Sequence, residues 1–243
     1  MMKKQKIKIF GLIWATAGLC FLIWIGNSYQ TKGVDTTIFQ NNSTVQVKNT
    51  NDFISFTPKK GYQKVFIFYP GTLVEPEAYT PLCRKIANNG YKSIIIKMPW
   101  RLPSYGYKRP KEMGFFKDTT KQYILAGHSK GGMMASQFVY ENPTLIDKLI
   151  LLGTTQPRDF DLSKSSISIM KIYGSNDGVA DAKSLVLNKP KLPATTKYIL
   201  IEGANHSQFG YYGSQLGDNK ATISREQQQQ IILNTILSFI KSR

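Results

Sequence analysis

The residues best suited to chemistry lie in a Gly-x-Ser-x-Gly motif at residues 127–131, centred on Ser129. An apolar run at residues 123–126 precedes the motif and helix-forming residues follow it, which is the strand–turn–helix setting of a nucleophile elbow. Such a turn holds its serine in a strained backbone conformation with the hydroxyl exposed, and the flanking glycines avoid a collision across the turn. The pattern predicts that Ser129 is a nucleophile; the alternative is a serine of an ordinary turn.

A serine hydroxyl is a weak nucleophile at neutral pH and needs a neighbouring base, whose tautomer is fixed by a carboxylate. In this architecture the acid follows the serine along the chain and the histidine comes last. The chain has two histidines. His128 adjoins Ser129 and should point away from its hydroxyl, so we interpret His128 as a packing or turn residue. His206 follows a predicted strand at residues 197–201, at a carboxyl end where sites in open α/β sheets gather, and we predict that it is the base.

The acid should follow the preceding strand, and Asp177 lies there in a glycine-flanked turn at residues 174–178. Its order and position favour Asp177 over Asp181, Asp159 and Asp161. A purely structural role in an Asx-turn is the alternative for Asp177.

The oxyanion that develops during attack on an acyl carbon needs two backbone N–H donors. One comes from the residue after the nucleophile, Lys130, and the other from the turn after an early strand, where Thr72 follows Pro70 and Gly71. An ordinary strand-ending turn is the alternative for that segment. The predicted chemistry uses no cofactor and no metal.

The N-terminus has the features of a membrane anchor. Residues 1–8 are rich in lysine, and residues 9–26 carry no charge. As a helix these residues are about 27 Å long, close to the thickness of a hydrocarbon core. The lysines predict a cytoplasmic N-terminus and an extracytoplasmic domain. The alternative is a cleaved signal peptide and a secreted protein, and residues 27–44 are expected to form a polar linker.

The composition is strongly basic, with 32 Lys and Arg against 15 Asp and Glu and a net charge of +17. A nucleic-acid-binding protein would show a basic stripe interleaved with aromatic residues or a recognition motif, and neither is present. We therefore expect no nucleic-acid partner. Attraction to an anionic membrane or envelope surface is one explanation of the charge, and a general lysine bias is the other.

The remainder of the chain predicts one α/β domain at residues 45–243. Residues 45–48 and 53–56 alternate apolar and polar around a turn, as in a hairpin at a sheet edge. Further strands are expected at residues 64–69, 93–97, 123–126, 149–152, 167–173 and 197–201, and helices before Gly90, from Gly131 and after Ser224. Ser224 and Gln227 form a capping-box pattern. Strands that alternate with helices indicate a mostly parallel sheet, here preceded by an antiparallel hairpin.

Five segments also resemble a known family: FYPGTLVEPEAYTPL (68–82), KMPW (97–100), AGHSKGG (126–132), YGSNDGV (173–179) and EGANHSQFGYYGSQLGD (202–218). Over residues 45–243 the chain resembles small bacterial α/β-hydrolases without a large cap domain. The resemblance implies the α/β-hydrolase fold and a triad of Ser129, Asp177 and His206. Lys130 stands where leucine is commoner in such elbows, and residues 103–120 carry no family signature, so the resemblance assigns no substrate.

Only residues 153–166 separate two of the predicted strands at the place where such hydrolases insert a lid, so an open pocket is expected. Its walls could be formed by Tyr105, Tyr107, Phe209, Tyr211 and Tyr212, which otherwise would pack on the sheet.

Two functions follow from these patterns. The first is a membrane-tethered serine hydrolase that cleaves a small-molecule ester, thioester or related acyl bond through an acyl-enzyme. The second is a non-catalytic binding or scaffold protein on the same fold.

Overall fold

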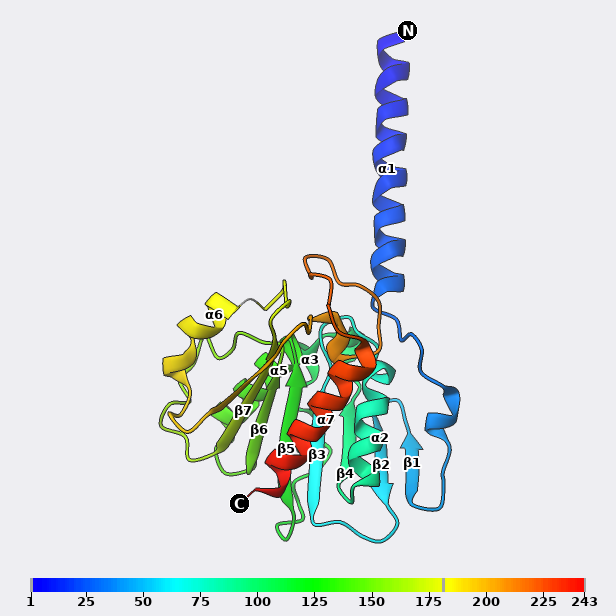
Figure 1. Ribbon diagram of the computed structural model, residues 1–243. Helices are drawn as coiled ribbons and strands as arrows, with labels where there is room; N and C mark the ends of the chain where they lie inside the picture. The colour runs from blue at the N-terminus through cyan, green and yellow to red at the C-terminus, as the bar shows by residue number, and fades with distance from the viewer. Residues whose placement is uncertain (1, 181, 243) are drawn as a thin grey trace.

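The computed structural model describes residues 2–180 and 182–242 and contains one eight-stranded sheet in that part of the chain (Figure 1). The strand order is β1-β2-β4-β3-β5-β6-β7-β8. The strands are β1 (Val45–Asn49), β2 (Phe53–Pro58), β3 (Lys64–Tyr69), β4 (Lys92–Ile96), β5 (Gln122–His128), β6 (Lys148–Leu152), β7 (Ser168–Gly174) and β8 (Lys197–Ile201).

The α-helices are α1 (Met2–Ser28), α2 (Thr80–Asn88), α3 (Pro103–Gly106), α4 (Arg109–Glu112), α5 (Lys130–Glu141), α6 (Ala182–Leu187) and α7 (Arg225–Lys241). Short 3₁₀ helices are η1 (Thr36–Phe39), η2 (Pro76–Tyr79), η3 (Pro99–Arg101), η4 (Lys189–Lys191) and η5 (Ser207–Phe209).

The predicted edge hairpin is confirmed: β1 pairs antiparallel with β2, with Val45 opposite Pro58. β2 is also antiparallel to β4, and from β4 to β8 every pair of neighbouring strands is parallel. The carboxyl ends of these parallel strands therefore lie along one edge of the sheet, where the predicted site residues follow β3, β5, β7 and β8.

Helices cover both faces of the sheet. Alternate residues of β3 point to opposite faces, so that Phe66 and Phe68 pack with α2 and α7, whereas Val65 and Ile67 pack with α5. Because both faces are buried, the parallel strands are almost continuously apolar. The predicted capping box of α7 is present, since the Ser224 side chain accepts from the Gln227 N–H and the Gln227 side chain accepts from the Ser224 N–H.

At the N-terminus, among the described residues, one helix is long and apolar enough to cross a membrane, over Lys8–Ser28 with a mean hydropathy of 2.1. Its apolar side chains are exposed, and α1 extends away from the domain (Figure 1).

The segment at residues 27–44, which the sequence led us to expect as a linker, lies against the domain over much of its length. Ser28 is buried, and its carbonyl accepts a hydrogen bond of 2.7 Å from the Gly213 N–H. Thr31 forms an isolated bridge with Tyr212, and Arg84 of α2 donates to the Ile38 carbonyl. The chain is therefore attached to the domain directly after α1 ends.

Candidate active site

Ser129 occupies a sharp turn between β5, which ends at His128, and α5, which begins at Lys130. Its backbone angles are φ 54° and ψ −122°, a conformation that non-glycine residues rarely adopt. A Cβ on Gly127 would lie 2.5 Å from Gly131 C, and a Cβ on Gly131 would overlap the Tyr69 carbonyl of β3. Both glycines are therefore required by close approach of backbone, and the strained turn matches the predicted elbow.

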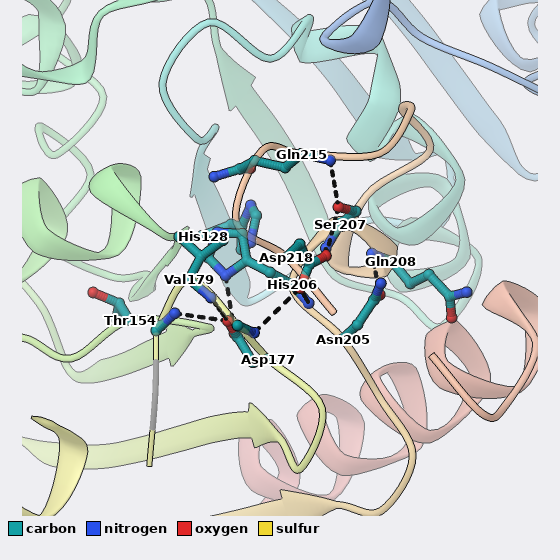
Figure 2. Close-up of polar contacts among 12 residues, drawn as sticks. His128, Thr154, Asp177, Val179, Asn205, His206, Ser207, Gln208, Gln215 and Asp218 are labelled. Carbon is teal, nitrogen blue, oxygen red and sulfur yellow. Dashed lines mark hydrogen bonds and ion pairs between the residues drawn. The ribbon is translucent and has the colours of Figure 1, made fainter. Parts of the chain in front are cut away.

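Asp177 and His206 form a buried pair at the ends of β7 and β8. Asp177 Oδ2 lies 2.9 Å from His206 Nδ1, and both side chains are inaccessible to solvent (Figure 2). The second carboxylate oxygen accepts from the backbone N–H groups of Val179 at 2.9 Å and Ala180 at 2.7 Å. This carboxylate is held from both sides, so the Nδ1–H of His206 donates to it and Nε2 is left as the basic nitrogen.

His206 Nε2 is buried and has no hydrogen-bond partner among the described residues. The structure thus joins Asp177 to His206 and brings Ser129 to the same sheet edge, but no hydrogen bond in the described part links Ser129 Oγ to His206. In hydrolytic sites this bond is often long without substrate and shortens when substrate binds.

The other candidate acids are not placed in this way. Asp159 and Asp161 are exposed, and Asp161 accepts from the Ser163 N–H. Asp181 lies outside the described residues.

Asp218 was missed as a positioning residue by the sequence reasoning. Its carboxylate accepts from the His206 N–H at 3.1 Å, the Ser207 Oγ at 2.6 Å and the Gly178 N–H at 3.3 Å. It therefore bridges the loop that contains His206 and the loop that contains Asp177. Its position at the end of the glycine-rich segment 202–218 was the available signal.

His128 belongs to a separate buried network. Its Nδ1 lies 2.9 Å from the Tyr79 hydroxyl, which also accepts from the Gly71 N–H at 3.1 Å. Because the Gly71 N–H can only donate, the acceptor next to the Tyr79 proton is His128 Nδ1, which places the imidazole proton on Nε2. Burial, together with His206 at 4.5 Å between ring centroids, holds the pKa of His128 well below its usual value. His128 is a neutral packing residue that contacts His206 and, through Tyr79, supports the turn that contains Gly71.

The two predicted oxyanion donors lie on either side of this network. Lys130 is the first residue of α5, so its N–H has no acceptor within the helix. The Thr72 N–H also has no hydrogen-bond partner within the described chain. Leu73, the next residue, has a φ of 63° and donates to the Arg101 carbonyl at 2.8 Å, which fixes the turn.

A pocket of about 190 Å³ opens beside Ser129. Its lining comes from the start of α5 and the loops after β6 and β7: Lys130, Met133, Thr154, Gln156, Arg158 and Val179, among others. Residues 153–167 join β6 to β7 without a helix or strand, as expected for an open site.

The expected aromatic wall does not line this pocket. Phe209 and Tyr212 are buried beneath the site, where Phe209 stacks on His128, and Tyr107 is held by Glu141 of α5. Tyr211 contacts Arg225, and Tyr105 is exposed at the rim. Of the five, Phe209 and Tyr212 fill the space around the buried imidazole of His128, at 5.4 and 6.3 Å between ring centroids.

Lys171 is an unexpected buried cation behind the pocket. It lies on β7 with 1 % of its surface exposed, and its Nζ donates to the Gln156 carbonyl at 2.7 Å. Burial lowers the pKa of Lys171 to about 7. The residue fixes one of the loop segments that line the pocket.

A model described as alpha/beta hydrolase family matches residues 65–230. Carboxylesterase CesB of Bacillus subtilis is similar in structure, with a TM-score of 0.55 and 10 % identity over 84 % of this chain and 94 % of its own. Est1E of Butyrivibrio proteoclasticus has a TM-score of 0.58 and 14 % identity, over 82 % of this chain and 100 % of its own. TT1662 of Thermus thermophilus has a TM-score of 0.59 and 12 % identity, over 82 % of this chain and 99 % of its own. No curated protein matches the sequence. At these identities the structural likeness shows the α/β-hydrolase fold, as predicted.

Proposed function

The chain belongs to the alpha/beta hydrolase family, and on this premise we propose that it is a serine hydrolase that cleaves an ester, thioester or related acyl bond. The observation that carries the proposal is the buried pair of Asp177 and His206 at the sheet edge that also presents Ser129 in a strained elbow. Isolated buried ionisable pairs are costly, and such pairs cluster at functional sites.

The proposed mechanism has two halves. His206 Nε2 removes the proton of the Ser129 hydroxyl as Oγ attacks the acyl carbon, and the N–H groups of Thr72 and Lys130 stabilise the resulting oxyanion. The intermediate collapses as His206 returns the proton to the leaving group, which leaves an acyl-serine. Water, deprotonated by the same nitrogen, then attacks the acyl carbon and releases the acid and the free serine. Asp177 keeps the proton on Nδ1 throughout.

A non-catalytic binding protein on this fold is the second candidate. The observation that favours it is the lack of a hydrogen bond between Ser129 and His206 among the described residues. In that case the elbow would be a structural remnant and no acyl-enzyme would form.

Fluorophosphonate labelling separates the two candidates. The wild-type chain should be labelled covalently and should hydrolyse at least one member of an ester panel, whereas Ser129→Ala should show neither. His206→Ala should lose labelling as well, while His128→Gln should retain most of it, because His128 Nδ1 is occupied by Tyr79. An unlabelled wild type with a normal thermal melt would favour the binding protein.

We also propose that α1 anchors the enzyme in a membrane with the domain outside the cytoplasm. The support is the apolar helix Lys8–Ser28 and the lysine-rich start of the sequence. A chain cleaved near Tyr29 would lose the bond between the Ser28 carbonyl and the Gly213 N–H, which favours the uncleaved form. Activity of a C-terminal reporter that functions only in the cytoplasm would contradict this location. A mature chain that starts near Tyr29 would contradict the uncleaved anchor.

A further inference from the structure

Resting on the proposed hydrolase activity and anchor, we propose that the sheet edge around Ser129 docks on the surface of the bilayer that α1 enters, and that the substrate is an acyl ester resident in that bilayer.

The end of α1 is joined to the loops of the candidate site. The Ser28 carbonyl accepts from the Gly213 N–H at 2.7 Å, and the Lys32 N–H donates to the Tyr211 carbonyl at 2.8 Å. Both partners lie in the loop that follows His206. Tyr29 stacks on Tyr212 with 6.2 Å between ring centroids. The chain therefore leaves the anchor directly onto the loop of the proposed base, and α1 rises from the edge to which the parallel strands point (Figure 1).

Glu75 extends this joint to the oxyanion turn. The Glu75 N–H donates to the Tyr29 carbonyl at 3.1 Å, and its carboxylate accepts from the Thr31 N–H at 2.8 Å and from Arg101 at 2.7 Å. Partial burial opposes ionisation of Glu75, but the Thr31 N–H and the Arg101 charge hold its pKa below the usual value. One ionised carboxylate thus links the anchor, the turn after β3 and the loop after β4.

The same edge exposes apolar side chains. Outside α1, nine large apolar side chains are exposed in the described chain. Leu187 lies on α6, and five others follow β3, β4, β7 or β8 in loops or in the short helices η3 and α3. These five form what we call the apolar rim: Leu73, Trp100, Tyr105, Val179 and Leu216. Trp100 is 78 % exposed and packs edge-on against Tyr105. Val179 lines the pocket beside Ser129, and the backbone of the adjacent Gly178 lies so close to Gly217, next to Leu216, that a Cβ on Gly178 would be 2.3 Å from the Gly217 carbonyl oxygen. The rim residues therefore follow strands on both sides of β5, the strand that leads to Ser129.

Part of the rim lies in strained backbone. Among the described residues, four that are not glycine have positive φ: Ser129 itself, and Leu73, Trp100 and Arg101 at 63°, 49° and 58°. Strained residues of this kind persist where the surrounding structure holds them, and they cluster at functional sites. A tryptophan and a tyrosine held clear of the domain match the aromatic residues that settle at the headgroup level of bilayers.

Basic residues stand around the apolar rim. Lys32, Arg101 and Lys220 are exposed, and Lys130 and Arg158 line the pocket. Of these five, Arg101 is the one with a carboxylate partner among the described residues. Of the acids near this edge, Asp177, Asp218 and Glu75 are occupied by hydrogen bonds, whereas Glu202 after β8 and Asp159 after β6 are exposed. Cations without a carboxylate partner around an apolar centre complement an anionic headgroup layer. Because α1 is part of the same chain, it holds the rim close to the membrane that it enters.

Quenching of Trp100 by brominated lipid tests the docking. In the full chain, Trp14→Phe and Trp24→Phe leave Trp100 as the one tryptophan. We expect its emission to be quenched when brominated phosphatidylcholine and phosphatidylglycerol replace the unbrominated lipids of the vesicles, and less so without phosphatidylglycerol. The matched control adds Trp100→Phe and Lys60→Trp, which places the probe in the exposed turn before β3 at the opposite edge, and should show little quenching.

Equal quenching of the two probes would overturn the docking, and so would a Trp100 signal that depends on protein concentration instead of lipid, which would indicate a second copy on the rim. Fluorophosphonate labelling of Ser129 in the same vesicles keeps the two proposals separable. Labelled but unquenched protein refutes the docking alone, and quenched but unlabelled protein refutes the hydrolase.

The substrate class is tested by comparing a long-chain ester held in vesicles with a soluble short ester. Trp100→Ser with Leu216→Ser should lower the ratio of the vesicle-ester rate to the soluble-ester rate by about tenfold. The free energy lost when one buried large apolar side chain is removed already corresponds to such a factor in affinity. Tyr140→Ser with Ile231→Ser removes exposed apolar side chains away from the rim and should leave the ratio within about twofold of the wild type. An unchanged ratio in the rim variant would refute a bilayer-resident substrate.

Discussion

Replacing Lys171 by methionine should change how stability depends on pH. Its amino group is buried on β7 and has one polar contact among the described residues, the Gln156 carbonyl at 2.7 Å, and burial lowers its pKa to about 7. In the unfolded chain a lysine has a pKa of about 10.4. Between these values the unfolded chain holds a proton that the folded chain lacks, so the protonated lysine opposes folding.

The size of the effect follows from the two pKa values. Protonation of Lys171 reduces the free energy of unfolding by about 4 kcal/mol at pH 7 and by about 2 kcal/mol at pH 9. Stability should therefore rise by about 2 kcal/mol from pH 7 to pH 9 through Lys171. The destabilisation by Lys171 should reach its full size below pH 7. The Lys171→Met variant leaves the Gln156 carbonyl unpaired, which costs about 2 kcal/mol. The variant should be about 2 kcal/mol more stable than the wild type at pH 7 and about equal to it at pH 9.

Urea unfolding of the full chain in detergent, followed by far-ultraviolet circular dichroism at pH 7 and pH 9, measures this difference. Lys197→Met removes a lysine from the exposed edge strand β8 and controls for the change in net charge. Wild-type and Lys171→Met curves that shift in parallel between the two pH values would refute the reasoning, because a lysine with an ordinary pKa gives no such difference.

Three further predictions concern the site. Asp177→Asn should lower turnover by about 10⁴, the loss found when the orienting acid of a serine protease triad is replaced, with an unchanged melt; ester hydrolysis measures it, and more than a tenth of wild-type turnover would exclude Asp177 as the acid. Asp218→Asn should slow turnover by about tenfold and weaken the fold by about 1 to 3 kcal/mol, which paired kinetics and melts would show; an unchanged rate would mean that it does not position His206. Gly131→Ala should destabilise the fold by about 1 to 3 kcal/mol, since its Cβ meets the backbone of β3; a melt unchanged from wild type would show that the elbow can widen.

The sequence predicted the strands and the elbow well because their signals are local. Residues 64–69 are an apolar run bounded by a Pro-Gly turn, and β3 has those bounds in the structure. Ser224 and Gln227 lie three residues apart, and a capping box depends on that spacing. The helices α3 and α4 were missed because each is a single turn in a segment rich in proline and glycine, with no periodicity to read.

The supporting residues of the site could not be predicted, because their partners are distant along the chain. Tyr79 reaches His128 across 49 residues, and Asp218 reaches Gly178 across 40. No local pattern distinguishes such a tyrosine from one that packs on the sheet. The contacts of residues 27–44 with the domain could not be predicted for a similar reason: a polar segment gains its order from carbonyls and N–H groups of the domain, which the composition does not reveal.

The attachment of residues 28–32 to the site loops determines how far the proposed enzyme can reach. A free linker of 18 residues would allow a domain to move about 60 Å from its anchor. Here the chain is hydrogen-bonded to the domain within four residues of the end of α1. The domain would then share the lateral motion of its anchor and search an area instead of a volume. Its substrates would be those that diffuse in, or settle on, the same leaflet.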